Sequence, residues 1–198
     1  MDALACQHRP ASSSPTVIVL AAGRGERFLA SGGVVHKLDT LLEGESVLEH
    51  VLGAVKASGL PWHLVRPAGG TAGMGDSIAL GVKATAIAAG WLILPGDLPL
   101  IRAESLRHVA LALNEHPVVV PHHRYRRGHP VGFRRECLAA LRTLTGDAGA
   151  ASVVRTYRDR GRVLDLSLDD PGIAFDVDSL DDLREAERLL RMQAQMVG

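Results

Sequence analysis

The sequence predicts an α/β protein built around a mostly parallel β-sheet. Residues 17–20 and 91–96 are uninterrupted apolar runs of strand length, which suit strands buried on both faces of a parallel sheet. A third strand is expected at 62–66. The segments between these runs repeat apolar side chains at helical spacing. We therefore expect strands and helices to alternate along the chain.

Two helices are expected between the first three strands. Residues 46–58 carry apolar side chains at helical spacing, with Ser46 as the N-cap and Glu49 as its capping-box partner. Gly59 is expected to end this helix. The next helix starts in the glycine-rich segment after the second strand and is expected to end at Gly90.

The second half of the chain continues the alternation. Asp147 is read first as the N-cap of a helix through 153–159, and Ser179 with Asp182 as the cap of the last helix. Asp176 and Asp178 fall in or next to a short expected strand, where residues two apart face the same side. The remaining expected elements are a helix at 103–115 and strands at 118–121 and 174–177.

Composition and charge exclude several classes of protein. The 198 residues contain 22 Lys and Arg and 22 Asp and Glu, so no net field favours a nucleic-acid polymer or an anionic membrane. No apolar run is long enough to span a membrane, and we expect a cytoplasmic protein. Residues 1–15 read as a disordered tail and 16–198 as a single domain. The two cysteines, Cys6 and Cys137, do not suggest a disulfide framework.

The first strand leads directly into a candidate phosphate-binding loop. Gly23 and Gly25 allow a close backbone approach to a ligand, and Arg24 and Arg27 add positive charge. A nicotinamide-binding fingerprint is disfavoured because Phe28 occupies the place of its third glycine, and no P-loop string occurs. A turn without a ligand remains the alternative for this segment alone.

The string LAAGRGERF, followed by His36, Lys37 and Leu38, resembles the signature loop of nucleotidyltransferases that activate small phosphorylated substrates with an NTP. Within that family it most resembles the molybdenum-cofactor cytidylyltransferases, because Ala22 matches their LAAG string. Lys37 follows Arg27 by ten positions, so residues 28–36 form a small insertion that is either a lid or a surface loop. The resemblance implies a Rossmann-like three-layer α/β/α sandwich of the nucleotide-diphospho-sugar transferase type.

Further strings of the family follow in the expected order. They are GMGDSIALG, GDLP, GHPVGF, LTGDAGA and DVDSLDDL. Catalytic roles are implied for Arg27, Lys37 and Asp97. Nucleotide contacts are implied for Leu20, Ala21, Ala22, Gly23, Arg24, Gly25, Met74, Gly75 and Ser77. Acceptor contacts are implied for His129, Pro130 and Asp147, and a Mg²⁺ site for Asp97 with Asp178 or Asp176.

Two of these segments can also be interpreted from their residues alone, without the resemblance. Asp97 follows a buried strand and lies between Gly96 and Pro99, so it is placed either to hold a divalent metal or to serve the turn. A basic rim that would suit the phosphate of an acceptor is expected from Arg124, Arg126, Arg127 and His129.

The resemblance implies a Mg²⁺-dependent transfer of CMP from CTP to the phosphate of molybdopterin, with release of pyrophosphate. A molybdenum hydroxylase apo-enzyme is the implied recipient of the product. Two alternatives stay open. One is a guanylyltransferase or another NTP transferase with a different phosphorylated acceptor, and the other is a non-catalytic chaperone that binds the molybdenum cofactor.

Overall fold

A computed structural model of the chain describes residues 14–197. The tail expected at 1–15, with Cys6, lies outside the described residues except for its last two positions. The strands are β1 Thr16–Leu20, β2 Leu41–Leu42, β3 Glu45–Ser46, β4 Trp62–Val65, β5 Gly90–Pro95, β6 Val118–His123, β7 Arg126–Arg127, β8 Val131–Arg134 and β9 Val163–Ser167. The helices are α1 Glu26–Ala30, α2 Val47–Ser58, α3 Met74–Ala84, α4 Ala103–Ala112, α5 Leu138–Leu141, α6 Ala151–Arg158 and α7 Leu180–Val197.

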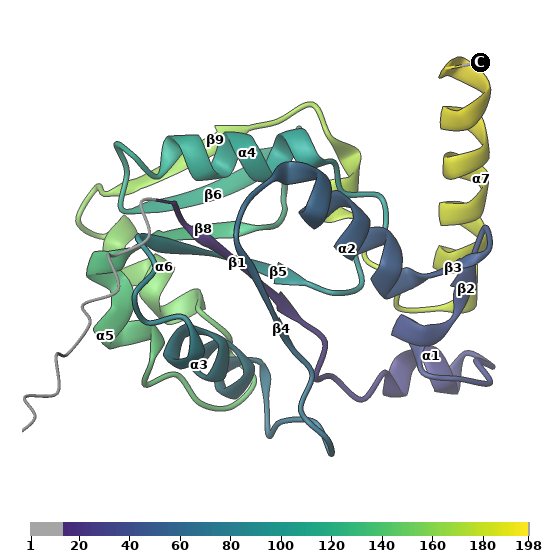
Figure 1. The fold of residues 1–198 in the computed structure, drawn as a ribbon, viewed down its shortest axis with the longest axis horizontal. Helices are drawn as coiled ribbons and strands as arrows, with labels where there is room; N and C mark the ends of the chain where they lie inside the picture. Colours follow the sequence, from purple (N-terminus) through teal and green to yellow (C-terminus); the bar gives the residue numbers. More distant parts are fainter. Residues whose placement is uncertain (1–13, 198) are drawn as a thin grey trace, which may run out of the picture.

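One large sheet runs through this part of the chain in the order β4-β1-β5-β8-β6-β7, with β9 paired to β6 (Figure 1). β4, β1 and β5 are parallel, as are β6 and β9, whereas β8 is antiparallel to both of its neighbours. β8 follows β6 through the short strand β7, and such a connection is too short for the crossover that a parallel pair requires. The predicted mostly parallel sheet is confirmed.

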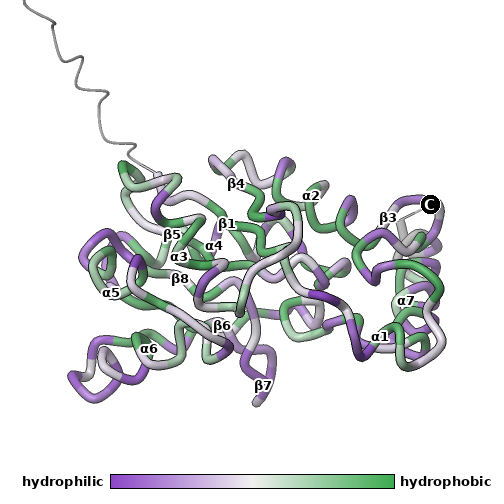
Figure 2. Tube along the Cα trace, turned by 90° about the horizontal axis from the view of Figure 1, so that it is seen from below, coloured by the Kyte–Doolittle hydropathy of each residue, from purple (hydrophilic) through white to green (hydrophobic). Residues whose placement is uncertain are grey.

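Helices cover both faces of the sheet. On β1 the side chains of Val17 and Val19 enter a core formed with α2, α4 and α7, while Ile18 enters a second core formed with α3, α5 and α6. All three side chains are fully buried. Figure 2 shows hydrophobic residues gathered along the inner strands β1 and β5. The expected three-layer α/β/α sandwich is therefore correct.

The caps of α2 agree with the sequence. The amide of Glu49 donates to the hydroxyl of Ser46 at 3.3 Å, and the amide of Ser46 donates to the Glu49 carboxylate at 2.8 Å. Gly59 follows the helix with a φ of 73°, in the left-handed region that favours glycine. The predicted capping box and the predicted stop are both confirmed.

The expected end of α3 at Gly90 is wrong. The helix stops at Ala84, and Thr85 is its C-cap. The Thr85 hydroxyl donates to the carbonyl of Gly81 at 2.7 Å and accepts from the indole of Trp91 at 2.9 Å. These bonds hold Thr85 in a turn that leads into β5, and Gly90 is already the first residue of that strand.

The strand expected at 174–177 is also wrong. Pro171–Ala174 form a 3₁₀ turn, and residues 175–178 after it form neither helix nor strand. One backbone bond, from the amide of Val177 to the carbonyl of Asp97 at 3.0 Å, attaches this segment to the loop after β5. Of residues 174–177, Val177 is the one that is buried.

Asp147 is not the N-cap of α6. The helix starts at Ala151, its N-cap is Ala150, and no side chain caps it. The amide of Gly146, next to Asp147, instead donates to the carboxylate of Asp76 in α3 at 2.9 Å. The loop before α6 is thereby tied to the start of α3.

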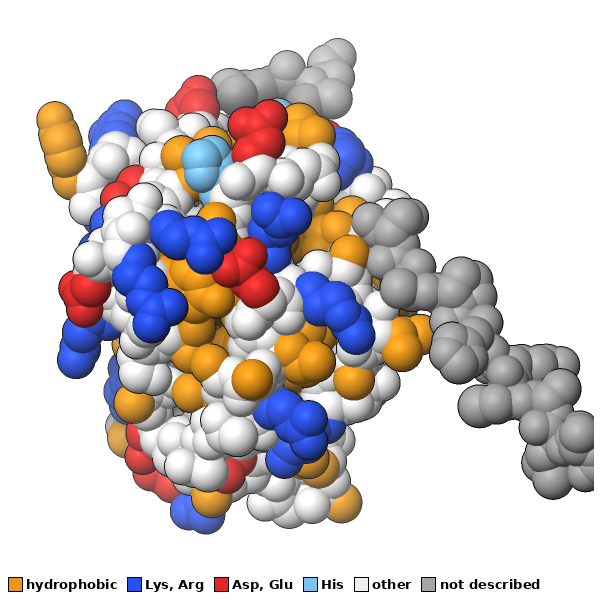
Figure 3. All heavy atoms as spheres, turned by 90° about the vertical axis from the view of Figure 1, so that its left-hand side faces the viewer, with side chains coloured by type: hydrophobic (Ala, Val, Ile, Leu, Met, Phe, Trp, Pro, Cys, Tyr) orange, Lys and Arg blue, Asp and Glu red, His pale blue; other side chains and the backbone are white. Residues whose placement is uncertain are grey.

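Charged side chains are mixed over the surface. On the face drawn in Figure 3, Lys and Arg side chains are separated by acidic, polar and hydrophobic groups. No continuous basic surface covers the described residues on that face. Among residues 14–197, no helix combines the length and the apolar character that crossing a membrane requires.

Candidate active site

Loops from three parts of the chain meet beyond the carboxyl ends of β1 and β5. The amide of Gly96 donates to the carbonyl of Leu20 at 2.8 Å, which joins the loops that follow these two strands. The bond from Val177 to Asp97 adds the segment before α7. In α/β proteins this edge of the sheet is where ligands bind.

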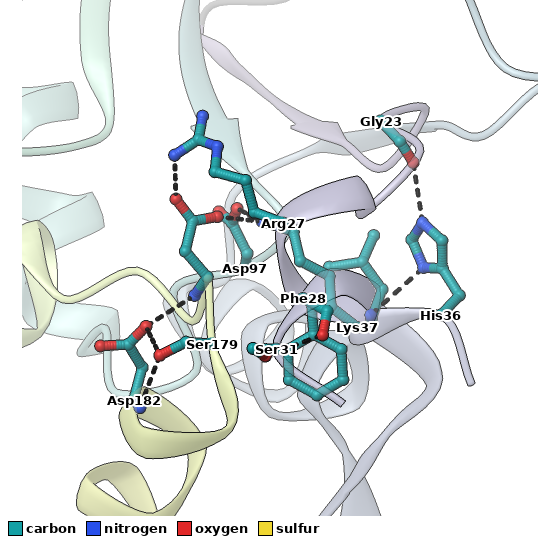
Figure 4. Close-up of polar contacts among 11 residues, drawn as sticks. Gly23, Arg27, Phe28, Ser31, His36, Lys37, Asp97, Ser179 and Asp182 are labelled. Carbon is teal, nitrogen blue, oxygen red and sulfur yellow. Dashed lines mark hydrogen bonds and ion pairs between the residues drawn. The ribbon is translucent and has the colours of Figure 1, made fainter. Parts of the chain in front are cut away.

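Lys37 lies at the centre of this junction. Its ammonium nitrogen is 2.7 Å from a carboxylate oxygen of Asp97 and 2.7 Å from one of Asp178 (Figure 4). The second oxygen of Asp178 accepts from the guanidinium of Arg27. The Lys37 side chain is only 13% exposed. The structure thus gathers four of the residues for which a catalytic or metal-binding role is expected, despite the ten positions between Arg27 and Lys37.

These contacts shift the pKa of both Lys37 and Asp178. Burial alone would lower the pKa of Lys37, but the charge of Asp97 and hydrogen bonds to both carboxylates raise it above its ordinary value. Partial burial acts to raise the pKa of Asp178, whereas the hydrogen bond and charge of Lys37 and the charge of Arg27 lower it below its ordinary value. Both groups are therefore held in their charged forms.

The N-terminus of α7 positions Asp178. The Asp182 carboxylate accepts from the amide of Asp178 at 3.1 Å and from the hydroxyl of Ser179 at 2.7 Å. The amide of Asp182 in turn donates to the Ser179 hydroxyl at 3.2 Å. The expected cap of the last helix is confirmed, and it fixes the backbone of a site residue (Figure 4).

The candidate phosphate loop is closed by His36. The Nε2 of His36 donates to the carbonyl of Gly23 at 2.7 Å, and its Nδ1 accepts from the amide of Leu38 at 3.2 Å. Gly25 has a φ of 66° and precedes α1 directly. The structural role of His36 was not expected, although the residue stands beside Lys37 in the motif.

The insertion at 28–36 has two parts. Phe28 is buried in the core, and the hydroxyl of Ser31 accepts from the amide of Leu180 at 3.1 Å, so the first part is attached to the start of α7. Val34 and Val35 are exposed.

The glycine-rich start of α3 has a structural explanation as well as the expected nucleotide role. The amide of Gly75 donates to the carbonyl of Gly146 at 2.7 Å, and a Cβ atom on Gly75 would lie 2.7 Å from the carbonyl oxygen of Thr145. The Ser77 hydroxyl is buried and engages Thr71 at 2.7 Å. Close approach of the 145–147 loop therefore requires glycine here.

The expected acceptor residues lie on the α3 and α6 side of the junction. Pro130 is buried, and burial lowers the pKa of His129, against the charges of Asp97 and Asp176. The four residues of the expected basic rim do not lie together. Arg127 and His129 line a cavity, whereas Arg124 and Arg126 are exposed and lie outside its lining.

Asp97 and Asp178 form a pair of carboxylates and not a larger cluster. In the described part of the chain, no three His, Cys, Asp or Glu side chains are grouped so that they could hold a metal ion. Asp176 is exposed and does not complete such a group with Asp97 and Asp178. The oxygens of Asp97 and Asp178 nevertheless converge on one cationic atom of Lys37, and carboxylate oxygens are the ligands that Mg²⁺ prefers.

A family model described as "MobA-like NTP transferase domain" matches residues 55–162, more than half of the chain. The chain belongs to this family. The match includes Asp97 and His129 and begins after the signature loop. The expectation of a nucleotidyltransferase is confirmed at the level of the family.

Solved structures of MobA-like and related proteins share the fold. Rv0371c from Mycobacterium tuberculosis H37Rv is 23% identical with a TM-score of 0.74, and the alignment covers 90% of this chain and 99% of that one. A nucleotidyl transferase from Methanothermobacter is 22% identical with a TM-score of 0.72, covering 91% and 100%. Molybdopterin-guanine dinucleotide biosynthesis protein A from Archaeoglobus fulgidus is 18% identical with a TM-score of 0.60, covering 89% and 99%. No curated protein matches the chain.

Proposed function

We propose that this MobA-like protein is a Mg²⁺-dependent cytidylyltransferase that transfers CMP from CTP to the phosphate of molybdopterin. The observation that carries the proposal is the convergence of Lys37, Asp97 and Asp178 beside the phosphate loop. We further propose that residues 16–198 form one transferase domain. A molybdenum hydroxylase apo-enzyme is the proposed recipient of the product.

Asp97 and Asp178 would hold the divalent metal. When bound, the metal would neutralise phosphate charge during the transfer. Rv0371c, which has a similar fold, has been solved in complex with manganese, and this supports a divalent ion as part of the proposal. Asp97 lies in the turn after β5 and Asp178 just before α7, and the backbone bond from Val177 to Asp97 joins the two segments.

The chain's own residues would position the reactants. Backbone amides of the loop at Gly23 to Gly25 would bind the triphosphate of CTP, and Arg27 and Lys37 would add positive charge. An oxygen of the acceptor phosphate would form a bond to the α-phosphorus, and the bond to the β-phosphate would break, releasing pyrophosphate. The attacking oxygen is already anionic, so no general base is required of the protein.

The choice of CTP is supported by Ala22 in the LAAG string, which resembles the cytidylyl branch. Among the solved structures, CMP:2-keto-3-deoxy-manno-octonic acid synthetase was determined with CTP, whereas the Archaeoglobus protein is named for a guanine dinucleotide. An assay therefore has to decide which nucleobase, cytosine or guanine, the enzyme uses.

The test is pyrophosphate release with Mg²⁺ and each of CTP, GTP, ATP and UTP, with and without molybdenum-loaded molybdopterin. Release with CTP only when the acceptor is present is the expected result. Release with GTP instead would indicate the guanylyl alternative. Tight acceptor binding without release from any nucleotide would indicate the chaperone.

Asp97→Ala tests the proposed site directly. We expect the variant to lose turnover by at least about 10²-fold, because a metal ligand is removed. Asp181→Asn is the matched control, since Asp181 is exposed on α7 and pairs only with Arg184 among the described residues. Near wild-type turnover of Asp97→Ala with Mg²⁺ would contradict the proposal.

A further inference from the structure

A short hairpin with an exposed aromatic residue at its tip joins β6 to β7. His122 pairs with Arg127 and His123 with Arg126, so Arg124 and Tyr125 form a two-residue loop. In Figure 2, β7 projects from the body of the molecule and is hydrophilic. Tyr125 is fully exposed. Its ring therefore contributes nothing to the packing of the core, which is the usual contribution of an aromatic side chain.

The backbone of this loop is strained at Arg124. Its φ is 55°, in the left-handed region. Two-residue hairpin loops place glycine, asparagine or aspartate where φ is positive, because other side chains are strained there. Among residues 14–197, Glu43 is the only other non-glycine residue with a positive φ, and its carboxylate pairs with Arg191. Strain of this kind is concentrated at functional sites, so the side chain of Arg124 calls for a role outside the hairpin.

The charges at the tip are not used within the described part of the chain. Neither Arg124 nor Arg126 forms an ion pair with any of residues 14–197, and Arg127 is exposed beside them. Tyrosine and arginine are the residue types enriched at the energetic centres of protein interfaces. Three arginines around one exposed tyrosine fit an acidic surface of a partner.

The small size of this basic tip favours a protein partner over a polyanion. Acidic and basic residues are equal in number over the whole chain, at 22 each. Nucleic acids and anionic membranes are bound through extended basic surfaces that neutralise many phosphates. A hairpin tip also buries less than the roughly 1,200–2,000 Å² of a stable protein interface, so it suits a transient contact.

The base of the hairpin is fixed and adjoins the cavity that His129 lines. The amide of Gly128 donates to the carbonyl of Pro121 at 2.8 Å, and the amide of Leu168 donates to the carbonyl of His122 at 2.8 Å. Arg127 and His129 line the same cavity of about 450 Å³. The tip is therefore held in place beside the expected acceptor residues.

We propose that the hairpin tip, Arg124 to Arg127, docks on an acidic surface of the protein that receives the product. This inference rests on the proposed function, which names a molybdenum hydroxylase apo-enzyme as the recipient. Docking at the tip holds the recipient next to the cavity, so the product passes to it without release into solvent. The fixed base lowers the ordering cost of binding. A weak contact suits this step because the loaded recipient has to leave.

The experiment measures binding to a molybdenum hydroxylase purified from the same organism without its cofactor, by biolayer interferometry. Tyr125→Ser should weaken binding at least about tenfold, because a central tyrosine carries a large share of the binding energy. Arg126→Glu should slow association and reduce its dependence on salt, because it removes the attraction to the acidic surface. Arg142→Gln is the matched control, since Arg142 is exposed after α5 and has no ion pair within the described chain.

Arg124→Gly separates a role in binding from a role in folding. Glycine relieves the strain of the positive φ, so the urea midpoint should rise. Binding of the apo-enzyme should fall about threefold or more, because a charge at the interface is lost. Binding equal to that of the wild type would contradict the proposal, whatever the midpoint does.

Two further results would overturn the docking surface. One is undiminished binding by Tyr125→Ser, and the other is absence of apo-enzyme binding by the wild type. Vesicles of phosphatidylserine and phosphatidylcholine test the other anionic surface. Vesicle binding that Tyr125→Ser abolishes would assign the tip to a membrane and overturn the protein partner. Circular dichroism of each variant checks that it is folded.

The outcome is separable from that of the proposed function. Tyr125→Ser should release pyrophosphate as the wild type does, since Tyr125 lies outside the cavity lining. If no nucleotide releases pyrophosphate while the apo-enzyme binds through the hairpin, the docking surface stands and the transferase proposal fails. If CTP is consumed while apo-enzyme binding does not depend on the hairpin, the transferase stands and the docking surface fails.

Discussion

The ammonium nitrogen of Lys37 lies 2.7 Å from the carboxylate of Asp97, although 60 positions separate the two residues. The same nitrogen also contacts Asp178, so a lysine occupies the point on which both carboxylates converge. A divalent ion coordinated by both carboxylates would have to share this space with the ammonium or displace it. Lys37 therefore compensates the two negative charges in the protein without ligands.

Lys37→Ala is expected to separate metal affinity from turnover. Without nucleotide, the two carboxylates lose their competing cation, so the affinity for Mn²⁺ should rise on the order of tenfold. Turnover should fall by about 10²-fold or more, because the charge that faces the triphosphate is lost. Paramagnetic resonance of free Mn²⁺ gives the first quantity and pyrophosphate release the second.

Lys56→Ala provides the control for this variant, since Lys56 is exposed in the last turn of α2. It should change neither quantity. Weaker Mn²⁺ binding by Lys37→Ala would mean that Lys37 supports the metal site instead of competing for it.

Asp178→Asn should make the stability of the protein depend less on pH in the acid range. The folded-state pKa of Asp178 is below its ordinary value of 3.8, so its contribution is fully present above that value and is lost as the pH falls through the folded-state pKa. The wild type should therefore lose more stability than the variant between about pH 5 and pH 3. Urea midpoints measured with a chelator present provide the comparison.

Asp159→Asn is a suitable reference because Asp159 is exposed after α6 and has no ion pair within the described chain. The stability of Asp159→Asn should fall with decreasing pH in parallel with that of the wild type. If Asp178→Asn and the wild type lose stability equally as the pH falls, the contacts with Lys37 and Arg27 do not lower the pKa of Asp178.

Local signals were sufficient for much of the fold. The capping box of Ser46 and Glu49 and the stop at Gly59 depend on neighbours within a few residues, so the sequence predicts them correctly. The end of α3 was missed because Thr85 is held by Trp91, a contact that local periodicity does not report. The strand expected at 174–177 was wrong because four residues that include one buried valine do not distinguish a strand from an irregular segment.

The site shows the same division. The resemblance to the family predicted that Lys37, Asp97 and Asp178 belong to one site, because each lies in a string that the family shares. The position of Arg155 and Arg158 at the cavity was not expected, because both belong to an ordinary amphipathic helix and reach the cavity only when α6 packs against the sheet. Two arginines spaced three apart on a helix are the only local signal, and that spacing is common on solvated faces.

His36→Ala is expected to weaken nucleotide binding up to about tenfold, because each of its two hydrogen bonds has a net worth of roughly 0.5–1.5 kcal/mol. The bond to Gly23 holds the phosphate loop closed, so KM for the nucleotide should rise while kcat changes little. His36→Gln retains a side-chain donor and should recover part of the affinity. His108→Ala, in an exposed position of α4, is the control, and an equal loss there would remove the specific role of His36.

Gly81→Ala and Gly53→Ala should change stability in opposite directions, although both glycines lie inside helices. In α3, a Cβ on Gly81 would lie 2.5 Å from Cγ2 of Ile18 and 3.0 Å from Cγ2 of Val65, so α3 would have to move off the sheet. We expect a loss of about 1–3 kcal/mol in the free energy of unfolding. Gly53 is exposed in α2 with nothing within 4 Å of the added atom, and the gain in helix propensity should stabilise the protein by about 0.5–1 kcal/mol. Urea unfolding of the two variants decides the matter, and stabilisation by both would show that α3 tolerates a larger separation from β1.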